Sequence, residues 1–323
     1  MKRPFDIVCA LVRNRVFDAG EEIPAGVDWE AVLECAVRQE VNAICYEAVK
    51  LLPQDRQPSF ALMMKWDISA QAIREMYSLR LKAASEVCDI LGAEGISPVM
   101  LKGLTLAPLY PEPSERESAD VDILTFHDRA KADDVMRSRD IEVMGEGHHT
   151  SFKYNGILFE NHGTDVKWDF NFRRSDYHVL GFLDRHAADA LPGPEGFMML
   201  PPAVTAVFLV KHLKQHLRWN AKVNVKQFTD LALLLRANPG IMDNVLSGLK
   251  SVGLRHFGKT MMRVSEMVTG VDLHIKTGIL SKAAAAFIVK CVLPLPRANN
   301  ILLQYSIVAR DIIVSRLHRR GII

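Results

Sequence analysis

Two carboxylates, Asp120 and Asp122, lie one residue apart within the apolar run SADVDILTF. Alternate residues of a strand point to the same face, so the pattern predicts that both acids project together while Val121 and Ile123 point into a core. Adjacent carboxylates repel each other unless a cation lies between them. Mg²⁺ binds through one or two carboxylates together with substrate phosphates. The pair therefore indicates a platform for a magnesium-bound nucleotide, and the alternative is an acid that caps a loop.

A second motif lies upstream of the acids, where the apolar run VMLKG ends in Lys102 and Gly103. We predict a buried strand here, followed by a short helix across LTLAPLY. Backbone N–H groups at a helix start attract phosphate, and Gly103 would let a phosphate approach the backbone closely. Lys102 would add a positive charge, although a surface lysine at a strand end is the alternative.

The periodicity of apolar residues divides the chain into three regions. Residues 1–95 have helical spacing, with a long helix in DISAQAIREMYSLRLKAASEVCDILGAEG. Residues 96–190 contain short strand candidates, namely SPVMLKG, SADVDILTF, IEVMG, TSFKYN and ILFENH, with a hairpin turn at Asn155-Gly156. Helices return in residues 191–323 after LPGPEGFMMLPP at 191–202, which we predict to be a linker. We therefore predict an α+β fold, with a small mixed sheet flanked by N-terminal and C-terminal helical regions.

The composition limits the classes of protein to consider. The chain has 323 residues, of which 49% are hydrophobic, and its net charge is +2. It can build a sizeable core, and its charge does not indicate a nucleic-acid partner. Five cysteines without metal-ligand spacing favour a cytoplasmic location. Asp6 interrupts the apolar run at the N-terminus, and no run reaches the roughly 18 apolar residues of a membrane span, so we expect neither a signal peptide nor a membrane partner.

The order of strand, glycine turn, helix and Asp-x-Asp strand resembles the nucleotidyltransferase superfamily that includes DNA polymerase β. LKGLTLAPLY and RESADVDIL resemble its branch of uncharacterised nucleotidyltransferases, and so do DWEAVLECAVRQEVNAICYEAV, HHTSFKYNGILFENH and HLKQHLRWNAKVNVKQFTDLALLL, within residues 28–235. The resemblance implies Mg²⁺-dependent transfer of a nucleoside monophosphate from an NTP, expected to be ATP, to an acceptor hydroxyl with release of pyrophosphate. The alternative is a protein of this fold that binds a nucleotide or a partner without turnover.

The resemblance also implies roles for the residues of the two motifs. Asp120 and Asp122 would bind Mg²⁺. Lys102, Gly103 and Arg116, which precedes the acid pair, would hold the triphosphate. In this branch Lys-Gly stands where many relatives of the superfamily have Gly-Ser.

A third carboxylate on a neighbouring strand generally completes the metal site of the superfamily. In the matching block the family shows an acid two residues before a histidine, which here is Glu160 before His162. We predict Glu160 as a catalytic residue and the third metal ligand. Asp169, in the alternating run DVKWDFNF, is the rival because strand alternation fits both acids.

Several further histidines are of a type and spacing that could do chemistry. His212 and His216 lie four residues apart on a helical stretch and share a face, which allows a zinc-dependent hydrolase as a further alternative. We interpret His216 and Asp230 as residues that support the site or lie on its substrate side, with structural polar contacts as the alternative, and we interpret His148 and His149 as loop residues. For the acceptor we expect a small molecule or a protein, with a nucleic acid disfavoured by the net charge.

Overall fold

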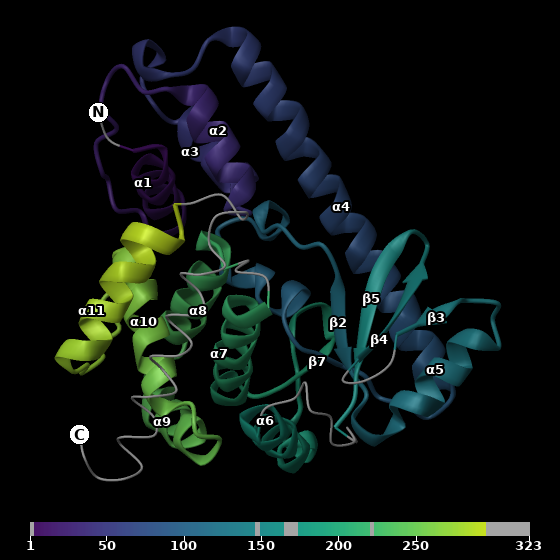
Figure 1. Ribbon diagram of the computed structural model, residues 1–323. Coiled ribbons are helices and arrows are strands. Elements are labelled where there is room, and N and C mark those ends of the chain that lie inside the picture. Colours follow the sequence, from purple (N-terminus) through teal and green to yellow (C-terminus); the bar gives the residue numbers. More distant parts are fainter. Residues whose placement is uncertain (1–2, 146–148, 165–173, 220–222, 295–323) are drawn as a thin grey trace. The chain divides into compact units, whose positions relative to one another are not determined.

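The computed structural model describes residues 3–145, 149–164, 174–219 and 223–294 (Figure 1). The chain groups into two compact units, each built from separate segments. The helical unit comprises residues 1–69, 209–240 and 254–323, and the sheet unit comprises residues 70–208 and 241–253. Within the described ranges, no helix combines the length and the apolar character that crossing a membrane requires.

The helical unit is built from amphipathic helices whose apolar faces form its core. Its helices are α1 (Pro4–Phe17), α2 (Trp29–Arg38), α3 (Asn42–Lys50), the start of α4 (Phe60–Ala93), most of α7 (Pro202–Trp219), α8 (Val225–Ala237), α10 (Arg255–Thr269) and α11 (Ile279–Phe287). Asp28 caps α2 by accepting a hydrogen bond from the Ala31 N–H at 3.1 Å. The buried Gln39 side chain accepts from the Val225 N–H and donates to the Leu293 carbonyl, which ties distant segments together.

The sheet unit contains seven strands within the described residues, in the order β3-β4-β5-β2-β1-β7-β6. They are β1 (Val99–Met100), β2 (Val121–Leu124), β3 (Val143–Met144), β4 (His149–Tyr154), β5 (Ile157–His162), β6 (Leu191–Pro192) and β7 (Met198–Met199). β2 pairs with β5 and β1 pairs with β7 in parallel, and the remaining pairs are antiparallel. The remainder of α4 belongs to this unit, with α5 (Arg129–Arg137), α6 (Arg174–Arg185) and α9 (Met242–Ser251). The mixed sheet with its helices confirms the predicted α+β class.

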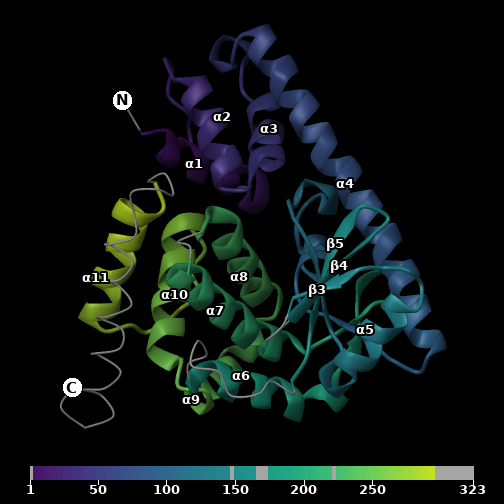
Figure 2. The same ribbon diagram turned by 45° about the vertical axis from the view of Figure 1, so that its right-hand side comes forward.

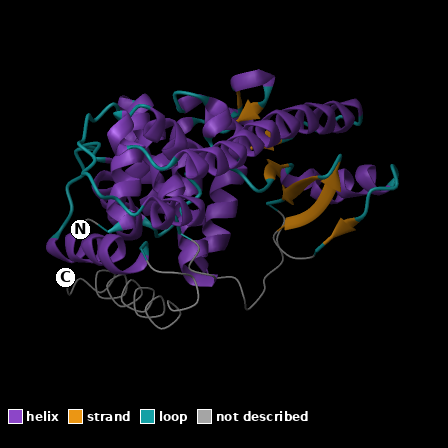
Figure 3. Cartoon of the chain, turned by 90° about the horizontal axis from the view of Figure 1, so that it is seen from above, coloured by secondary structure: helices purple, strands orange, loops and turns teal. Residues whose placement is uncertain are grey.

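One face of the sheet forms the core of this unit with α4 and α5. The strands contribute Val121, Ile123, Phe152 and Phe159, and the helices contribute Ala84, Val87, Leu91, Ala132 and Met136. The long helix α4 runs beside β4 and β5 (Figure 2), and the view from above shows a long helix beside the strands (Figure 3). Because side chains alternate along a strand, the residues between these core positions point to the opposite face.

The β4–β5 hairpin turns at the predicted dipeptide. Tyr154 pairs with Ile157, which leaves Asn155 and Gly156 as a two-residue loop. Both loop residues have positive φ, at 49° and 78°. A type I′ turn requires this geometry, and its twist matches that of the flanking strands. The turn fixes the register that places Glu160 within β5.

The predicted linker at 191–202 is wrong as a description of the local structure. Its residues form β6 and β7, and Val99 pairs with Met198 so that β7 extends the sheet beside β1. Phe197 and Leu200 are buried and hold the segment in place. The proline and glycine content of this segment favoured the prediction of a linker. Its two strands are very short, and tertiary burial stabilises them. The division into three regions stays a prediction.

Candidate active site

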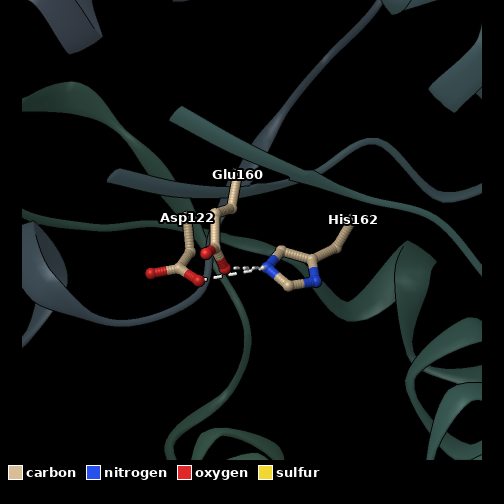
Figure 4. Close-up of side chains that lie close together, drawn as sticks. All are labelled: Asp122, Glu160 and His162. Carbon is tan, nitrogen blue, oxygen red and sulfur yellow. Dashed lines mark hydrogen bonds and ion pairs between the residues drawn. The ribbon is translucent and has the colours of Figure 1, made fainter. Parts of the chain in front are cut away.

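The parallel pairing of β2 with β5 sets Asp122 directly opposite Glu160. Since Ile123 and Phe159 face the core, Asp122, Glu160 and His162 share the opposite face of the sheet (Figure 4). His162 Nε2 lies 3.0 Å from Asp122 Oδ1 and 3.6 Å from Glu160 Oε2. One ligand atom from each of these three residues lies within 4.8 Å of the other two. The structure therefore brings two predicted acids and the neighbouring histidine into one cluster.

Lys102 joins the two acids of the Asp-x-Asp motif. Its Nζ lies 2.7 Å from Asp122 Oδ2 and 3.5 Å from Asp120 Oδ1. Both carboxylates thus face the same ammonium group, which agrees with the prediction that they project together. The side chain of Asp122 is 2% exposed, whereas that of Asp120 is 20% exposed. Asp120 is therefore the acid of this pair that is more open to solvent.

The opposite charges of this cluster keep one another ionised, although burial alone would favour the neutral form of each group. Burial alone would raise the pKa of Asp122, but Lys102 and His162 outweigh it and hold the pKa well below its usual value. Burial would lower the pKa of Lys102, but Asp122 and Asp120 outweigh it and raise that pKa. A hydrogen bond from His162 lowers the pKa of Glu160 despite burial and the nearby Asp122. The carboxylates of Asp122 and Glu160 are therefore ionised at neutral pH, as a metal ligand must be.

The glycine turn lies beside the acid pair. Gly103 has a φ of +64°, and a Cβ built on it would lie 3.6 Å from Ser118 Oγ and 4.0 Å from Arg116 Nη1. Ser118 Oγ in turn donates to the Asp120 carbonyl at 2.9 Å. Arg116 is buried, at 4% exposed. The three residues predicted to hold a triphosphate, Lys102, Gly103 and Arg116, therefore gather at one end of β2.

The short helix predicted after this turn is wrong. The chain instead forms two separate 3₁₀ turns, Gly103–Thr105 and Ala107–Leu109. Pro108 has no backbone N–H, and Pro111 follows shortly after, so an α-helix cannot continue here. Each turn is too short to act as a helix N-terminus with aligned peptide dipoles. The positive charge at this turn comes instead from the Lys102 and Arg116 side chains.

A buried polar network supports β5 from the core face. Asn161, the residue between Glu160 and His162, is fully buried. The side-chain Nδ2 of Asn161 donates to Asp133 Oδ1 on α5 at 2.8 Å, and its side-chain Oδ1 accepts from Thr125 Oγ1 at 2.7 Å. Thr150 Oγ1 on β4 also donates to Asp133 Oδ1, at 2.8 Å. Sequence reasoning missed this network, although a polar residue at a core position of an alternating strand was a signal for it.

His149 was also missed, because we predicted it to lie in a loop. It begins β4 and pairs with His162 in the antiparallel register. Its Nε2 lies 3.8 Å from Glu160 Oε1, so Glu160 has an imidazole near each of its oxygens. His148 lies outside the described residues.

The other predicted residues fall in different parts of the chain. Asp169, the rival third acid, lies outside the described residues. His212 and His216 belong to the helical unit, with ring centroids 4.2 Å apart, as does Asp230. In the part of the chain that the structure describes, no third His, Cys, Asp or Glu completes a metal-binding group with that pair.

The donors of the Asp122 cluster fit a divalent cation. Two ionised carboxylates offer the hard oxygen ligands that Mg²⁺ prefers, and an imidazole nitrogen is also accepted by Mn²⁺ and Zn²⁺. A carboxylate that is ionised can only accept a hydrogen bond, so Nε2 of His162 carries a proton in the described arrangement. In this state the histidine orients the two acids.

A family model described as uncharacterised nucleotidyltransferase matches residues 25–270, which is most of the chain. No curated protein and no solved structure matches the chain. The matched span includes the glycine turn, the acid pair and Glu160.

Proposed function

Because the chain belongs to the uncharacterised nucleotidyltransferase family, we propose that it transfers a nucleoside monophosphate from an NTP to an acceptor hydroxyl and releases pyrophosphate. ATP is the expected donor. The observation that carries the proposal is the convergence of Asp122 and Glu160 across β2 and β5, with the glycine turn and its cations at the same strand. Carboxylates beside basic groups suit a nucleotide whose phosphates are bound with a cation.

Asp120, Asp122 and Glu160 are the proposed ligands of Mg²⁺, with Glu160 as the third acid. When bound, Mg²⁺ supplies positive charge to the phosphate oxygens and to the attacking hydroxyl. His162 donates a hydrogen bond to Asp122 and lies beside Glu160, so it fixes the orientation of both carboxylates before the nucleotide arrives. The buried Asn161–Asp133 contact holds β5 in register behind them.

Lys102 has a distinct proposed role, because its ammonium lies against both acids of the motif. It neutralises these carboxylates in the free protein. With a metal-bound triphosphate present, the same ammonium can pair with phosphate oxygens. Arg116, beside the glycine turn, is proposed to bind the same phosphates and to offset the charge that develops on the leaving pyrophosphate.

The acceptor is proposed to be a small molecule or a protein hydroxyl. The experiment is to incubate the purified protein with Mg²⁺ and a cell extract, using ATP labelled either at the α- or the γ-phosphate. Transfer predicts an extract component labelled from α-ATP but not from γ-ATP, together with released pyrophosphate. Label from γ-ATP alone would indicate a kinase and contradict the proposal.

The alternative without turnover has its own outcome in the same experiment. A protein that only binds nucleotide would bind ATP and Mg²⁺ in a calorimetric titration but release no pyrophosphate in any extract. Asp120→Ala with Asp122→Ala is the control, because any labelling that persists in this variant comes from the extract or from another site.

A further inference from the structure

One basic residue outside the predicted site lies on the buried stripe of α4. Tyr77, Ala84, Val87 and Leu91 of this helix pack against the core of the sheet unit. Arg80 follows Tyr77 by three residues and precedes Ala84 by four, so it occupies a position on the same stripe. It is 9% exposed, and its Nε has no hydrogen-bond partner among the residues that the structure describes. A buried donor without an acceptor destabilises a fold, so such a group requires an explanation.

The surroundings of Arg80 are those of the candidate active site. The charges that act on it are those of Asp120, Arg116 and Glu117, all in the segment that leads into β2. Burial lowers the pKa of Arg80, Asp120 opposes this effect, and the neighbouring Arg116 adds to it. Two buried guanidinium groups therefore lie within range of each other's charge, and the attraction of Asp120 for Arg80 is stronger than the repulsion by Arg116.

The acids nearby are shared with another cation. Asp120 lies 3.5 Å from Lys102 Nζ, and Asp122 lies 2.7 Å from it. Arg116 Nη1 lies 4.0 Å from the position of a Cβ on Gly103. Lys102 and Arg116 thus border the segment that holds the glycine turn and Asp120, and Arg80 lies within electrostatic range of Asp120 and Arg116. A polyanion bound at this turn would provide acceptors for all three groups.

We propose that Arg80 binds the polyphosphate of the nucleotide together with Arg116 at the Gly103 turn. A guanidinium presents paired donors that match phosphate oxygens, whereas a single ammonium does not. The chemical class of the ligand is an inorganic or nucleoside polyphosphate. The inference rests on the proposed function, and it extends the nucleotide site to a residue of α4.

The test compares Arg80→Met with wild type and with Lys82→Gln, which removes an exposed positive charge from the same helix. Binding of inorganic tripolyphosphate and of ATP with Mg²⁺ is measured by calorimetry, and thermal unfolding is measured without ligand. We expect Arg80→Met to weaken tripolyphosphate and ATP binding by about tenfold or more. Its melting temperature should equal or exceed that of wild type, because a buried charge without a hydrogen-bond partner at Nε has been removed. Lys82→Gln should match wild type in both measurements.

Arg80→Lys separates charge from geometry, since it keeps the positive charge but lacks the paired donors. We expect an affinity for tripolyphosphate between those of wild type and Arg80→Met. Wild-type affinity in Arg80→Met, or a melting temperature well below that of wild type, would overturn the inference and assign Arg80 to the stability of the fold. A wild-type protein that binds neither ATP nor tripolyphosphate would overturn the proposed function as well.

Discussion

The carboxylates of Asp122 and Glu160 lie opposite each other on the parallel strands β2 and β5, and the imidazole of His162 is close to both. Residues 38 positions apart in the chain become neighbours only because these two strands pair. The pairing depends on the hydrophobic alternation of each strand, since a shift by one residue would turn both acids into the core. The register of the sheet is therefore what assembles the acids.

Replacement of Lys102 by Met should destabilise the protein and make its stability depend on Mg²⁺. The change leaves Asp120 and Asp122 without the ammonium that both contact, and breaking a buried ion pair costs about 3–5 kcal/mol. Because a divalent cation would take the place of the ammonium, Mg²⁺ should raise the melting temperature of this variant more than that of wild type. Thermal unfolding with and without Mg²⁺ measures the effect. An identical Mg²⁺ response in the two proteins would argue against a metal site at these acids.

Replacement of Glu160 by Gln should lower the rate of transfer by about 10²-fold or more while the fold remains intact, because a ligand and charge at the reacting centre are lost. The exposed Glu142, which directly precedes β3, provides the matched control, and Glu142→Gln should retain the wild-type rate. Pyrophosphate release measures the rates. If Glu160→Gln were as active as its control, the third acid would have to be sought elsewhere in the chain, with Asp169 as the first candidate.

The free energy of unfolding should depend on pH through the ionisation of Asp122. Its pKa in the folded state is lower than in the unfolded chain, where it is about 3.9. The contribution of its ionised form is therefore complete at neutral pH and is lost as the pH falls below about 4. The difference in unfolding free energy between wild type and Asp122→Asn should shrink as the pH is lowered from 6 to 3. Urea denaturation between about pH 3 and pH 6 provides the measurement. A constant difference would mean that Asp122 is not held in its ionised form.

Replacement of Asp133 by Ala should destabilise the sheet unit by about 2–3 kcal/mol, because the buried donors of Asn161 and Thr150 lose their common acceptor. Asp133→Asn keeps one acceptor oxygen and should retain part of that stability. If the network positions β5, Asp133→Ala should also weaken the Mg²⁺ response of thermal unfolding even when the protein is folded. Normal Mg²⁺ binding in a destabilised variant would confine the network to a structural role.

The sequence allowed the local elements and the acids to be predicted, but not the contacts that depend on chain pairing. Alternation placed Val121 and Ile123 in the core and Asp122 on the opposite face, as observed. The Asn155-Gly156 turn was predictable because only a few dipeptides adopt positive φ at both positions. In contrast, β6 and β7 are two residues long and carry too little pattern to predict. Tertiary burial, not propensity, forms them.

Two features near the site were missed for different physical reasons. His149 looked like a loop residue because nothing local shows that it pairs with His162 across the hairpin. Arg80 is a charged residue within an apolar helical stripe. The periodicity of α4 indicates the face of the helix on which Arg80 lies, but it does not indicate which distant residues are near it. The neighbours of both residues are known only once the strands and α4 have their positions in the three-dimensional structure.

The central claim is that Asp120 and Asp122 hold a magnesium-bound nucleotide. Its most direct test is a calorimetric titration of ATP into wild type and into the variant Asp120→Ala with Asp122→Ala, each in Mg²⁺ and in a chelator. We predict that wild type binds ATP only when Mg²⁺ is present, and that the variant does not bind it under either condition while its helical content by circular dichroism is unchanged. Equal Mg²⁺-dependent ATP binding in a folded variant would mean that these two acids do not hold the nucleotide.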